Sequence, residues 1–300
     1  MSVFQGSAVA IVTPFHNGAV DFTAFTRLIE LQIASGTDAI VVCGTTGESA
    51  TLTVDEKLSV IQFVVERVNG RVPVIAGTGG NCTATVIENS RSAEAIGVDA
   101  LLVVTPYYNK TTQAGLIAHY MAVADSVDLP IITYNVPSRT GLNILPATMA
   151  ELLKHENIVG TKEASGNIEQ IVNLAALCPD CDIYAGNDDH VLPVLSIGGK
   201  GVISTIANVM PDAMHSLCES FFKGDLAAAR EMQIQMIPLW RAAFCEVNPI
   251  PTKAMMGMMK LCEPEVRLPL VPPSEASSLN MAPRFVVAMA VFVPLAVIIA

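Results

Sequence analysis

One lysine in this sequence directly follows a predicted buried strand. Lys162 comes straight after the apolar run Ile158–Thr161, so its side chain should emerge at the end of that strand, and the other lysines lie in predicted helices or loops. Burial disfavours the charged form of a lysine, and a neutral amine can attack a ketone to form an imine. The alternative is that Lys162 forms an ion pair with Glu163 or another acid. The position of the lysine in the sequence, taken alone, favours this alternative.

Hydroxyl groups follow the neighbouring predicted strands. Tyr134 ends the run Ile131–Tyr134, and Thr45 and Tyr108 follow two further runs. Imine chemistry transfers a proton at each step, and a phenol can act as the acid or the base. Each residue alone has an ordinary explanation in packing, but three hydroxyls beside one lysine favour a Schiff-base site. Arg139, just beyond Tyr134, is a cation suited to binding a carboxylate.

The charge balance of the chain limits its partners. It has 28 acidic and 17 basic residues, a net charge of −11, and no run of lysine or arginine. Nucleic-acid proteins carry basic patches, so that class is excluded. At 51% apolar and 15% charged residues, the composition fits a folded chain and excludes extensive disorder.

The elements that must position these side chains form a repeating pattern. Short, continuous apolar runs typical of parallel strands alternate with stretches of helical period. One such helix, Val54–Asn69, starts with a capping box of Thr53 and Glu56 and ends before Gly70. The predicted strands are Ala8–Phe15, Ala39–Cys43, Val74–Gly77, Ala100–Thr105, Ile131–Tyr134, Ile158–Thr161, Asp182–Ala185 and Gly201–Ile206.

Eight strand–helix units predict an α/β fold of the closed (β/α)8 type, the TIM barrel. An open doubly wound sheet is the alternative, but no strand is followed by a dinucleotide-binding G-x-G-x-x-G. Active sites of such barrels lie at the carboxyl ends of the strands, which is where Lys162, Tyr134 and Thr45 are predicted.

The chain divides into three predicted parts. Residues 1–210 form the barrel, 211–270 a helical region, and 271–300 an apolar tail of uncertain structure. The helices expected in the second part are Asp212–Lys223, Asp225–Phe244 and Pro249–Leu261. The apolar run Phe285–Ala300 would span about 24 Å, short of the roughly 30 Å membrane core. We therefore favour a docked tail over a membrane anchor.

Metal, redox and secretion signals are weak. The five histidines lack metal-ligand spacing, and Asp188-Asp189-His190 reads more simply as the N-cap of a helix. Cys178 and Cys181 form a lone C-x-x-C, which we interpret as two ordinary thiols. The first residues lack a basic region before their apolar stretch, so we do not expect them to be a signal peptide. These features predict a protein of the reducing cytosol without a metal or cofactor.

Four ordered motifs resemble the dihydrodipicolinate synthase family of pyruvate-dependent class I aldolases. The resemblance runs from about Phe4 to about Leu270, and its motifs are GTTGES at Gly44–Ser49, TPYYNK at Thr105–Lys110, YNVPSRTG at Tyr134–Gly141 and GTKEASGN at Gly160–Asn167. It implies condensation of pyruvate with L-aspartate 4-semialdehyde to 4-hydroxy-tetrahydrodipicolinate, in lysine and diaminopimelate biosynthesis. It also implies a homotetramer built as a dimer of dimers.

The resemblance also implies roles for individual residues. Lys162 would form the imine, and Tyr134, Thr45 and Tyr108 would relay protons, Tyr108 by reaching into a partner subunit. Substrate contacts would come from the residues Thr46, Arg139, Gly186 and the backbone of Ile203. Some members bind lysine as an inhibitor, and the residues matching that pocket are Ser49, Ala50, Asn81 and Tyr107.

Two alternatives stay open at this point. Sugar-acid aldolases share the lysine and the tyrosine, and Arg139 is what favours the dipicolinate branch. A catalytically silent, pyruvate-sensing barrel is disfavoured by the presence of Lys162, Tyr134 and Thr45. In the lysine pocket, Val54, Lys57 and Thr85 replace the histidines and glutamate of sensitive members, which predicts weak or absent inhibition.

Overall fold

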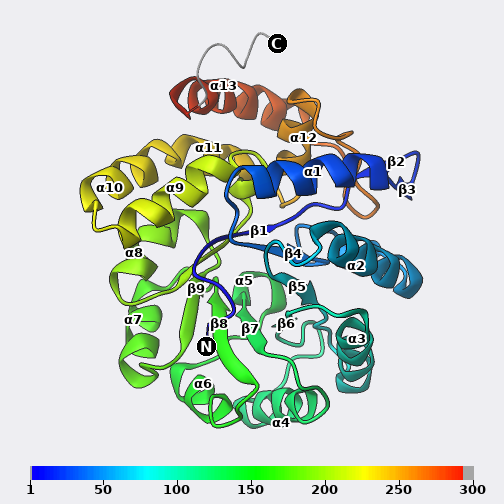
Figure 1. Ribbon diagram of the computed structural model, residues 1–300, viewed down its shortest axis with the longest axis vertical. Coiled ribbons are helices and arrows are strands. Elements are labelled where there is room, and N and C mark those ends of the chain that lie inside the picture. Colours follow the sequence, from blue (N-terminus) through cyan, green and yellow to red (C-terminus); the bar gives the residue numbers. More distant parts are fainter. Residues whose placement is uncertain (1, 293–300) are drawn as a thin grey trace.

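The computed structural model describes residues 2–292, and at its centre is a closed barrel of eight parallel strands (Figure 1). The strands follow one another in chain order, and the first pairs with both the last and the second, which closes the ring. They are β1 (Gly6–Ala10), β4 (Ala39–Val42), β5 (Val74–Gly77), β6 (Ala100–Val104), β7 (Ile131–Asn135), β8 (Ile158–Glu163), β9 (Asp182–Ala185) and β10 (Gly201–Ser204). The predicted (β/α)8 barrel is confirmed, and the open sheet is wrong.

The first predicted strand had the wrong limits. It was expected to run to Phe15, but β1 ends at Ala10 and the chain turns away from the barrel. Phe15 instead belongs to a small antiparallel hairpin of β2 (Phe15–His16) and β3 (Ala19–Val20). Pro14, which cannot donate a ladder hydrogen bond, lies between β1 and β2.

Helices surround the strands, as the alternating pattern predicts (Figure 1). Helix α2 shows how local sequence sets their ends. Thr53 accepts from the backbone of Glu56, the Glu56 side chain accepts in return, and left-handed Asn69 and Gly70 end the helix. The helices that follow the strands are α1 (Phe22–Ala34), α2 (Val54–Val68), α3 (Thr83–Ile96), α4 (Gln113–Ala124), α6 (Pro146–Leu152), α7 (Ile168–Leu177), α8 (Val191–Ser196) and α9 (Pro211–Phe222).

Short helical turns occupy several of the loops at the carboxyl ends of the strands. They are η1 (Ser49–Thr51), α5 (Pro137–Thr140), η2 (Asp188–His190) and η3 (Ile206–Asn208). The loops that carry GTTGES and YNVPSRTG are therefore ordered structures that can hold side chains at the barrel mouth.

The chain has two apolar cores, one inside the barrel and one between the barrel and its helices. The inner core is lined by small residues such as Ala8, Ala39 and Ala100, and by larger ones on the opposite strands. Phe4 stacks on Tyr184 with ring centroids 4.3 Å apart, and the Tyr184 hydroxyl donates to the Phe4 carbonyl. These two rings pack inside the amino-terminal end of the barrel.

The C-terminal helices stack together beside α1 on one side of the barrel (Figure 1). They are α10 (Leu226–Gln235), α11 (Ile237–Ala243), α12 (Ile250–Met258) and α13 (Glu275–Phe292). The single helix expected over Asp225–Phe244 is two helices, and Pro238 lies in the first turn of the second. Helix α13 occupies part of the predicted tail, whose residues 293–300 lie outside the described residues. Among the described residues, no helix is long and apolar enough to cross a membrane.

Candidate active site

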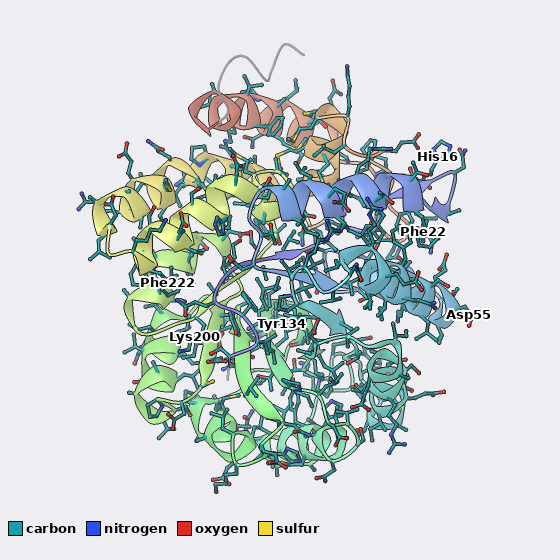
Figure 2. The ribbon with its side chains drawn as sticks, in the orientation of Figure 1. His16, Phe22, Asp55, Tyr134, Lys200 and Phe222 are labelled. Atoms are coloured by element: carbon teal, nitrogen blue, oxygen red, sulfur yellow. The ribbon has the colours of Figure 1, made fainter. Side chains whose placement is uncertain are left out.

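Lys162 lies inside strand β8, not after it as the sequence indicated. In the barrel register it pairs with Tyr134 of β7 on one side and with Tyr184 of β9 on the other. The lysine is 5% exposed and Tyr134 is 7% exposed. Figure 2 shows Tyr134 in the middle of the ring of helices, whereas His16, Asp55 and Phe222 lie at the rim.

A cavity of about 190 Å³ opens where these strands end. It is polar in character, and its lining comes from strands, loops and the C-terminal helices. The residues are Thr45, Thr46, Tyr134, Val136, Ser138, Arg139, Lys162, Ala164, Gly186, Asn187, Thr205, Phe244 and Asn248. The structure thus brings Lys162, Tyr134, Thr45, Thr46, Arg139 and Gly186 to one space, as predicted.

The amine of Lys162 stands over an aromatic ring. Its Nζ lies 4.4 Å from the centroid of Tyr134, and it forms no ion pair with any residue that the structure describes. The expected alternative, a salt bridge with Glu163, is absent from these contacts, because the Glu163 carboxylate accepts from Asn135, Ser165 and Gln170. The amine is therefore not neutralised by a contacting carboxylate.

Asp188 is a buried acid whose pKa responds to the charge of that amine. The segment Asp188–His190, predicted to be the N-cap of the following helix, forms η2, and His190 is the N-cap residue of α8 without a side-chain capping hydrogen bond. Its carboxylate accepts from the hydroxyl of Ser204 at 2.5 Å and from the backbone of Thr205 and Ile206. Burial raises the pKa of Asp188 to about 6, while those hydrogen bonds and the charge of Lys162 oppose the rise. The residue holds the end of β10 against the floor of the cavity.

The turn after β4 places Thr45 and Thr46 at the cavity. Thr46 is 2% exposed, and its hydroxyl accepts from the Asn248 side chain at 2.9 Å and lies 3.5 Å from that of Thr205. Thr45 lines the cavity and also a small space of about 40 Å³ that it shares with Tyr134. A hydroxyl beside the phenol is the arrangement that a proton relay needs.

Arg139 lies on the short helix α5 at the rim. Its guanidinium donates to the Asn248 carbonyl at 3.2 Å and forms no ion pair in the part of the chain that the structure describes. Most of its donors therefore remain available to an anionic ligand that enters the cavity.

Of the two remaining residues predicted to contact the substrate, Gly186 lines the cavity and Ile203 does not. Gly186 lines the cavity, and a Cβ there would stand 2.7 Å from the Ala164 side chain and 3.0 Å from the Glu163 carbonyl, so a larger residue would push into β8 beside Lys162. Ile203 is buried inside the barrel and is not among the lining residues, whereas Thr205, two residues on, is.

Comparison with known proteins shows the family of the chain. The dihydrodipicolinate synthetase family profile matches residues 3–284. The chain belongs to this family. A 4-hydroxy-tetrahydrodipicolinate synthase of Caldicellulosiruptor bescii is 53% identical over 276 residues, 92% of this chain and 94% of the relative.

Solved structures of the family superpose closely on the barrel. Dihydrodipicolinate synthase from Thermotoga maritima has a TM-score of 0.93 at 42% identity, with 96% of this chain and 99% of that chain covered. The enzyme from Cyanidioschyzon merolae with lysine bound has a TM-score of 0.92 at 36% identity, and the coverage is 96% and 99%.

A second cavity of about 310 Å³ adjoins the first, and the two share Thr45, Val136, Arg139 and Asn248. Three of the four residues that match the family's lysine pocket line it: Ser49, Ala50 and Tyr107. Asn81 is not among the lining residues, and its carbonyl accepts from the Asn109 side chain at 2.8 Å. Lys57 lines this cavity and brings a positive charge to it.

Tyr108 is the one predicted catalytic residue that the structure keeps away from the cavity. It is 90% exposed, and its backbone φ of +70° lies in the left-handed region that non-glycine residues rarely adopt. Its side chain therefore does not reach Lys162 of its own chain.

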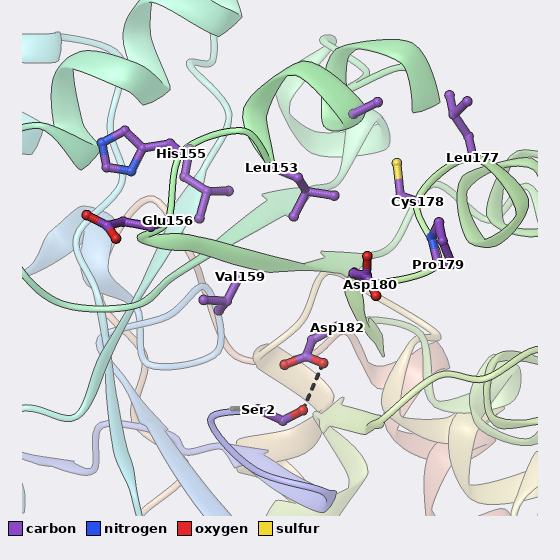
Figure 3. Close-up of a pocket in the computed structure, with 12 residues that line it drawn as sticks. Ser2, Leu153, His155, Glu156, Val159, Leu177, Cys178, Pro179, Asp180 and Asp182 are labelled. Carbon is purple, nitrogen blue, oxygen red and sulfur yellow. Dashed lines mark hydrogen bonds between the residues drawn. The ribbon is translucent and has the colours of Figure 1, made fainter.

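A larger cavity, about 510 Å³, lies at the other end of the barrel (Figure 3). It is lined by Ser2, His155, Glu156 and Asp180 among others, and the Ser2 hydroxyl donates to Asp182 at 2.8 Å. Barrel enzymes place their chemistry at the carboxyl ends of the strands, and this space holds neither Lys162 nor Tyr134. The cavity of about 190 Å³ that Lys162 and Tyr134 line is therefore the candidate active site.

The cysteines and histidines add no competing site. Cys178 and Cys181 are buried free thiols, and burial raises the pKa of both, which disfavours the reactive thiolate. Among the described residues, no cluster of side chains has the composition of a metal site.

Sequence reasoning missed the residues that the C-terminal region contributes. Asn248 and Phe244 line the cavity, but neither follows a predicted strand. Their placement depends on packing between segments about two hundred residues apart, as in the bond from Asn248 to Thr46. The apolar surroundings of Asn248 were the one available signal, since a buried amide must find a hydrogen-bonding partner.

Proposed function

We propose that the chain condenses pyruvate with L-aspartate 4-semialdehyde to give 4-hydroxy-tetrahydrodipicolinate, the reaction named for its relatives. The observation that carries the proposal is the buried amine of Lys162 over the Tyr134 ring, in a cavity bordered by the unpaired cation Arg139. An amine, a phenol and a carboxylate binder are the three groups that this condensation requires.

The first step joins pyruvate to the enzyme. The Lys162 amine attacks the keto carbon, the carbinolamine loses water, and an imine forms between Nζ and that carbon. Tyr134 supplies the proton that the departing water needs and recovers one later. Thr45, which shares a small space with Tyr134, passes the proton on.

The second step forms the carbon–carbon bond. The imine withdraws electrons, so the pyruvate methyl group loses a proton and becomes an enamine, which attacks the aldehyde carbon of the semialdehyde. The aldehyde oxygen takes up a proton to become the hydroxyl of the product. The amino group of the semialdehyde then attacks the imine carbon, closes the ring and releases Lys162.

Arg139 is the residue that would make the enzyme specific for the semialdehyde. Its guanidinium borders both cavities and has free donors, so it suits the carboxylate of the semialdehyde. In a chain of net charge −11, a local cation at the entrance offsets the repulsion of the carboxylate that each substrate carries. Thr46 and Gly186 complete the floor on which pyruvate would lie.

We also propose that Tyr108 acts across a subunit interface within a homotetramer. A tyrosine that is 90% exposed in the single chain, beside a Tyr107 that is 40% exposed, offers an aromatic surface for a second copy to cover. Sedimentation of the unaltered chain and of Tyr108→Phe tests this role. An active monomer would contradict it.

The decisive experiment is borohydride reduction in the presence of pyruvate, followed by mass spectrometry. We expect one pyruvate per chain on the peptide that contains Lys162, and rapid consumption of L-aspartate 4-semialdehyde by the unreduced enzyme. A chain labelled by pyruvate but active only on keto-deoxy sugar acids would belong to the sugar-acid aldolases. A chain labelled by pyruvate but inactive on both substrate classes would be a sensor.

A further inference from the structure

A second lysine, far along the chain from Lys162, is buried even more completely. Lys253 of α12 is 0% exposed, and its ammonium lies 2.5 Å from Oε1 of Glu48. It also donates to the Glu265 carbonyl at 2.7 Å and stands 4.0 Å from the centroid of the Phe15 ring. Burial lowers the pKa of Lys253, and the carboxylate of Glu48 opposes that shift.

Glu48 belongs to the turn that carries Thr45 and Thr46. Its side chain is 1% exposed, and its second oxygen accepts from the backbone N–H of Arg267 at 3.0 Å. The backbone of Glu48 is left-handed, with φ of +53°. Both carboxylate oxygens are therefore held by the C-terminal region while the residue itself keeps an uncommon conformation.

A cluster of five residues surrounds this contact, and we call it the Phe15 cluster: Phe15, Glu48, Glu56, Lys253 and Arg267. Arg267 also lies over Phe15, with its Cζ 4.3 Å from the ring centroid. Its guanidinium pairs with both carboxylate oxygens of Glu56, at 2.8 and 2.6 Å. Because Glu56 is the capping-box residue of α2, the cluster ties the C-terminal region to the middle of the loop between β4 and α2 and to the first turn of α2.

Stability alone is a poor explanation for such a pair. Removing two charges from water carries a large desolvation penalty, and apolar replacements of buried pairs are often as stable or more so. What a buried ion pair does supply is a defined geometry, since any other arrangement leaves a charge unpaired. The segment whose geometry is defined here is the one that points Thr45 and Thr46 at Lys162.

We propose that Lys253 is a positioning residue for the reaction: its ion pair with Glu48 fixes the turn Gly44–Thr51 so that Thr45 and Thr46 face the cavity that Lys162 enters. This inference rests on the proposed function, because the two threonines are given their roles by it. Lys253 itself does not line the cavity and acts only through Glu48.

The test replaces the ammonium by an apolar group of similar length. In Lys253→Met, Glu48 loses its cation and the turn leaves its position. We expect the rate of pyruvate imine formation, measured by borohydride trapping on Lys162, to fall by about 100-fold, the usual cost of displacing a reacting group by about 1 Å. The KM for the semialdehyde should change much less, because Arg139 is not part of the cluster.

A second variant separates positioning from general damage. Lys253→Met combined with Glu48→Gln removes the unpaired charge, and we expect it to recover about tenfold of the lost rate. Met255→Ala is the matched control, since Met255 is 0% exposed on the same helix and is not among the residues that line the cavity. It should lower the melting temperature and leave the trapping rate nearly unchanged well below that temperature.

The outcomes are distinct. Equal trapping rates in Lys253→Met and the unaltered chain would overturn the positioning role alone, as would equal losses in Lys253→Met and Met255→Ala. Absence of pyruvate labelling in the unaltered chain would overturn the proposed function and this role with it. If Lys253→Met does not fold, Glu48→Gln, which keeps the side-chain volume, must show the slowed trapping by itself; a normal rate there overturns the proposal.

Discussion

Lys162 and Lys253 are the two buried lysines of the described chain, and their surroundings differ in kind. Lys253 contacts a carboxylate, a carbonyl and an aromatic ring, so all the interactions of its ammonium are made within the protein. Lys162 contacts an aromatic ring and a cavity, with no carboxylate in ion-pair contact. The same side chain thus serves structure in one place and is left available for chemistry in the other.

The nearby acids explain the contrast. One carboxylate oxygen of Glu48 forms an ion pair with Lys253. The carboxylate of Asp188 instead accepts hydrogen bonds from Ser204 and from backbone N–H groups, and the charge of Lys162 only lowers its pKa. Burial by itself therefore does not identify a nucleophile. What distinguishes Lys162 is a buried amine that borders a cavity and has no carboxylate in ion-pair contact among the described residues.

The largest expected effect separates the two lysines completely. Lys162→Ala should abolish pyruvate labelling by borohydride, because Lys253 is 0% exposed and cannot reach a substrate. Mass spectrometry of the trapped chain measures it. Labelling that persists on any other lysine peptide would show that Lys162 is not the lysine that forms the imine.

The next effect concerns the ring beside Lys162. Tyr134→Phe keeps the aromatic surface and removes the phenol, so kcat should fall by about 10²–10⁴-fold, the usual contribution of a general acid–base group. The melting temperature should stay near that of the unaltered chain. A fall in kcat of less than about threefold would make Tyr134 a packing residue, as Phe15 is beside Lys253.

The acid beside Lys162 should show itself in the pH dependence of stability. The pKa of Asp188 is raised to about 6 in the fold, so the native state binds this proton more tightly than the unfolded chain. The contribution of this carboxyl group to the free energy of unfolding is fully present below about pH 4 and is lost as the pH rises through about 6. Relative to Asp188→Asn, which cannot titrate, the free energy of unfolding should fall by about 3 kcal/mol at most across that window.

Urea unfolding of both chains at about pH 4.5 and about pH 7.5 provides the measurement. A difference between the two chains that does not change with pH would mean that Asp188 stays ionised throughout. In that case it would act as a counter-charge to Lys162, and the contrast with Glu48 would disappear.

The smallest expected effect involves a third lysine, Lys57, at the second cavity. A lysine effector carries two ammonium groups, which the charge of Lys57 repels, and Thr85 offers no carboxylate in compensation. Losing one charge-assisted contact costs about 1.5–3 kcal/mol, so we expect little inhibition at low millimolar L-lysine. Initial rates at fixed pyruvate measure it, and half-inhibition below about 1 mM, roughly −4 kcal/mol of binding, would contradict the argument.

The sequence predicted the barrel and the site at Lys162 because both depend on local signals. Continuous apolar runs identify parallel strands, and the barrel then brings the residues at their carboxyl ends together. Thr45, Tyr134 and Arg139 were found in this way. Lys162 was found by the same rule, although it lies within β8 and not beyond it.

Contacts between distant segments could not be predicted in the same way. Lys253 has Thr252 and Ala254 as neighbours in sequence, but its partner Glu48 is some two hundred residues earlier. Gln32 is a polar residue on the apolar face of α1, yet it is 2% exposed and its amide donates to the Ala207 carbonyl. The helical period shows which face of a helix is buried, but it does not show which group will form a hydrogen bond with a polar side chain on that face.

The pairing of Gly6 with Gly201 has a consequence for how the protein is made. A ribosome adds about 5–20 residues per second, so β1 is outside the exit tunnel for many seconds before β10 exists. During that interval one edge of β1 has no strand to pair with, and an exposed strand edge is a template for aggregation. The turn with Thr45 is likewise synthesised early, but Arg267 must appear before Glu48 is held on both oxygens. The part of the chain that is translated first is therefore the part that reaches its working shape last.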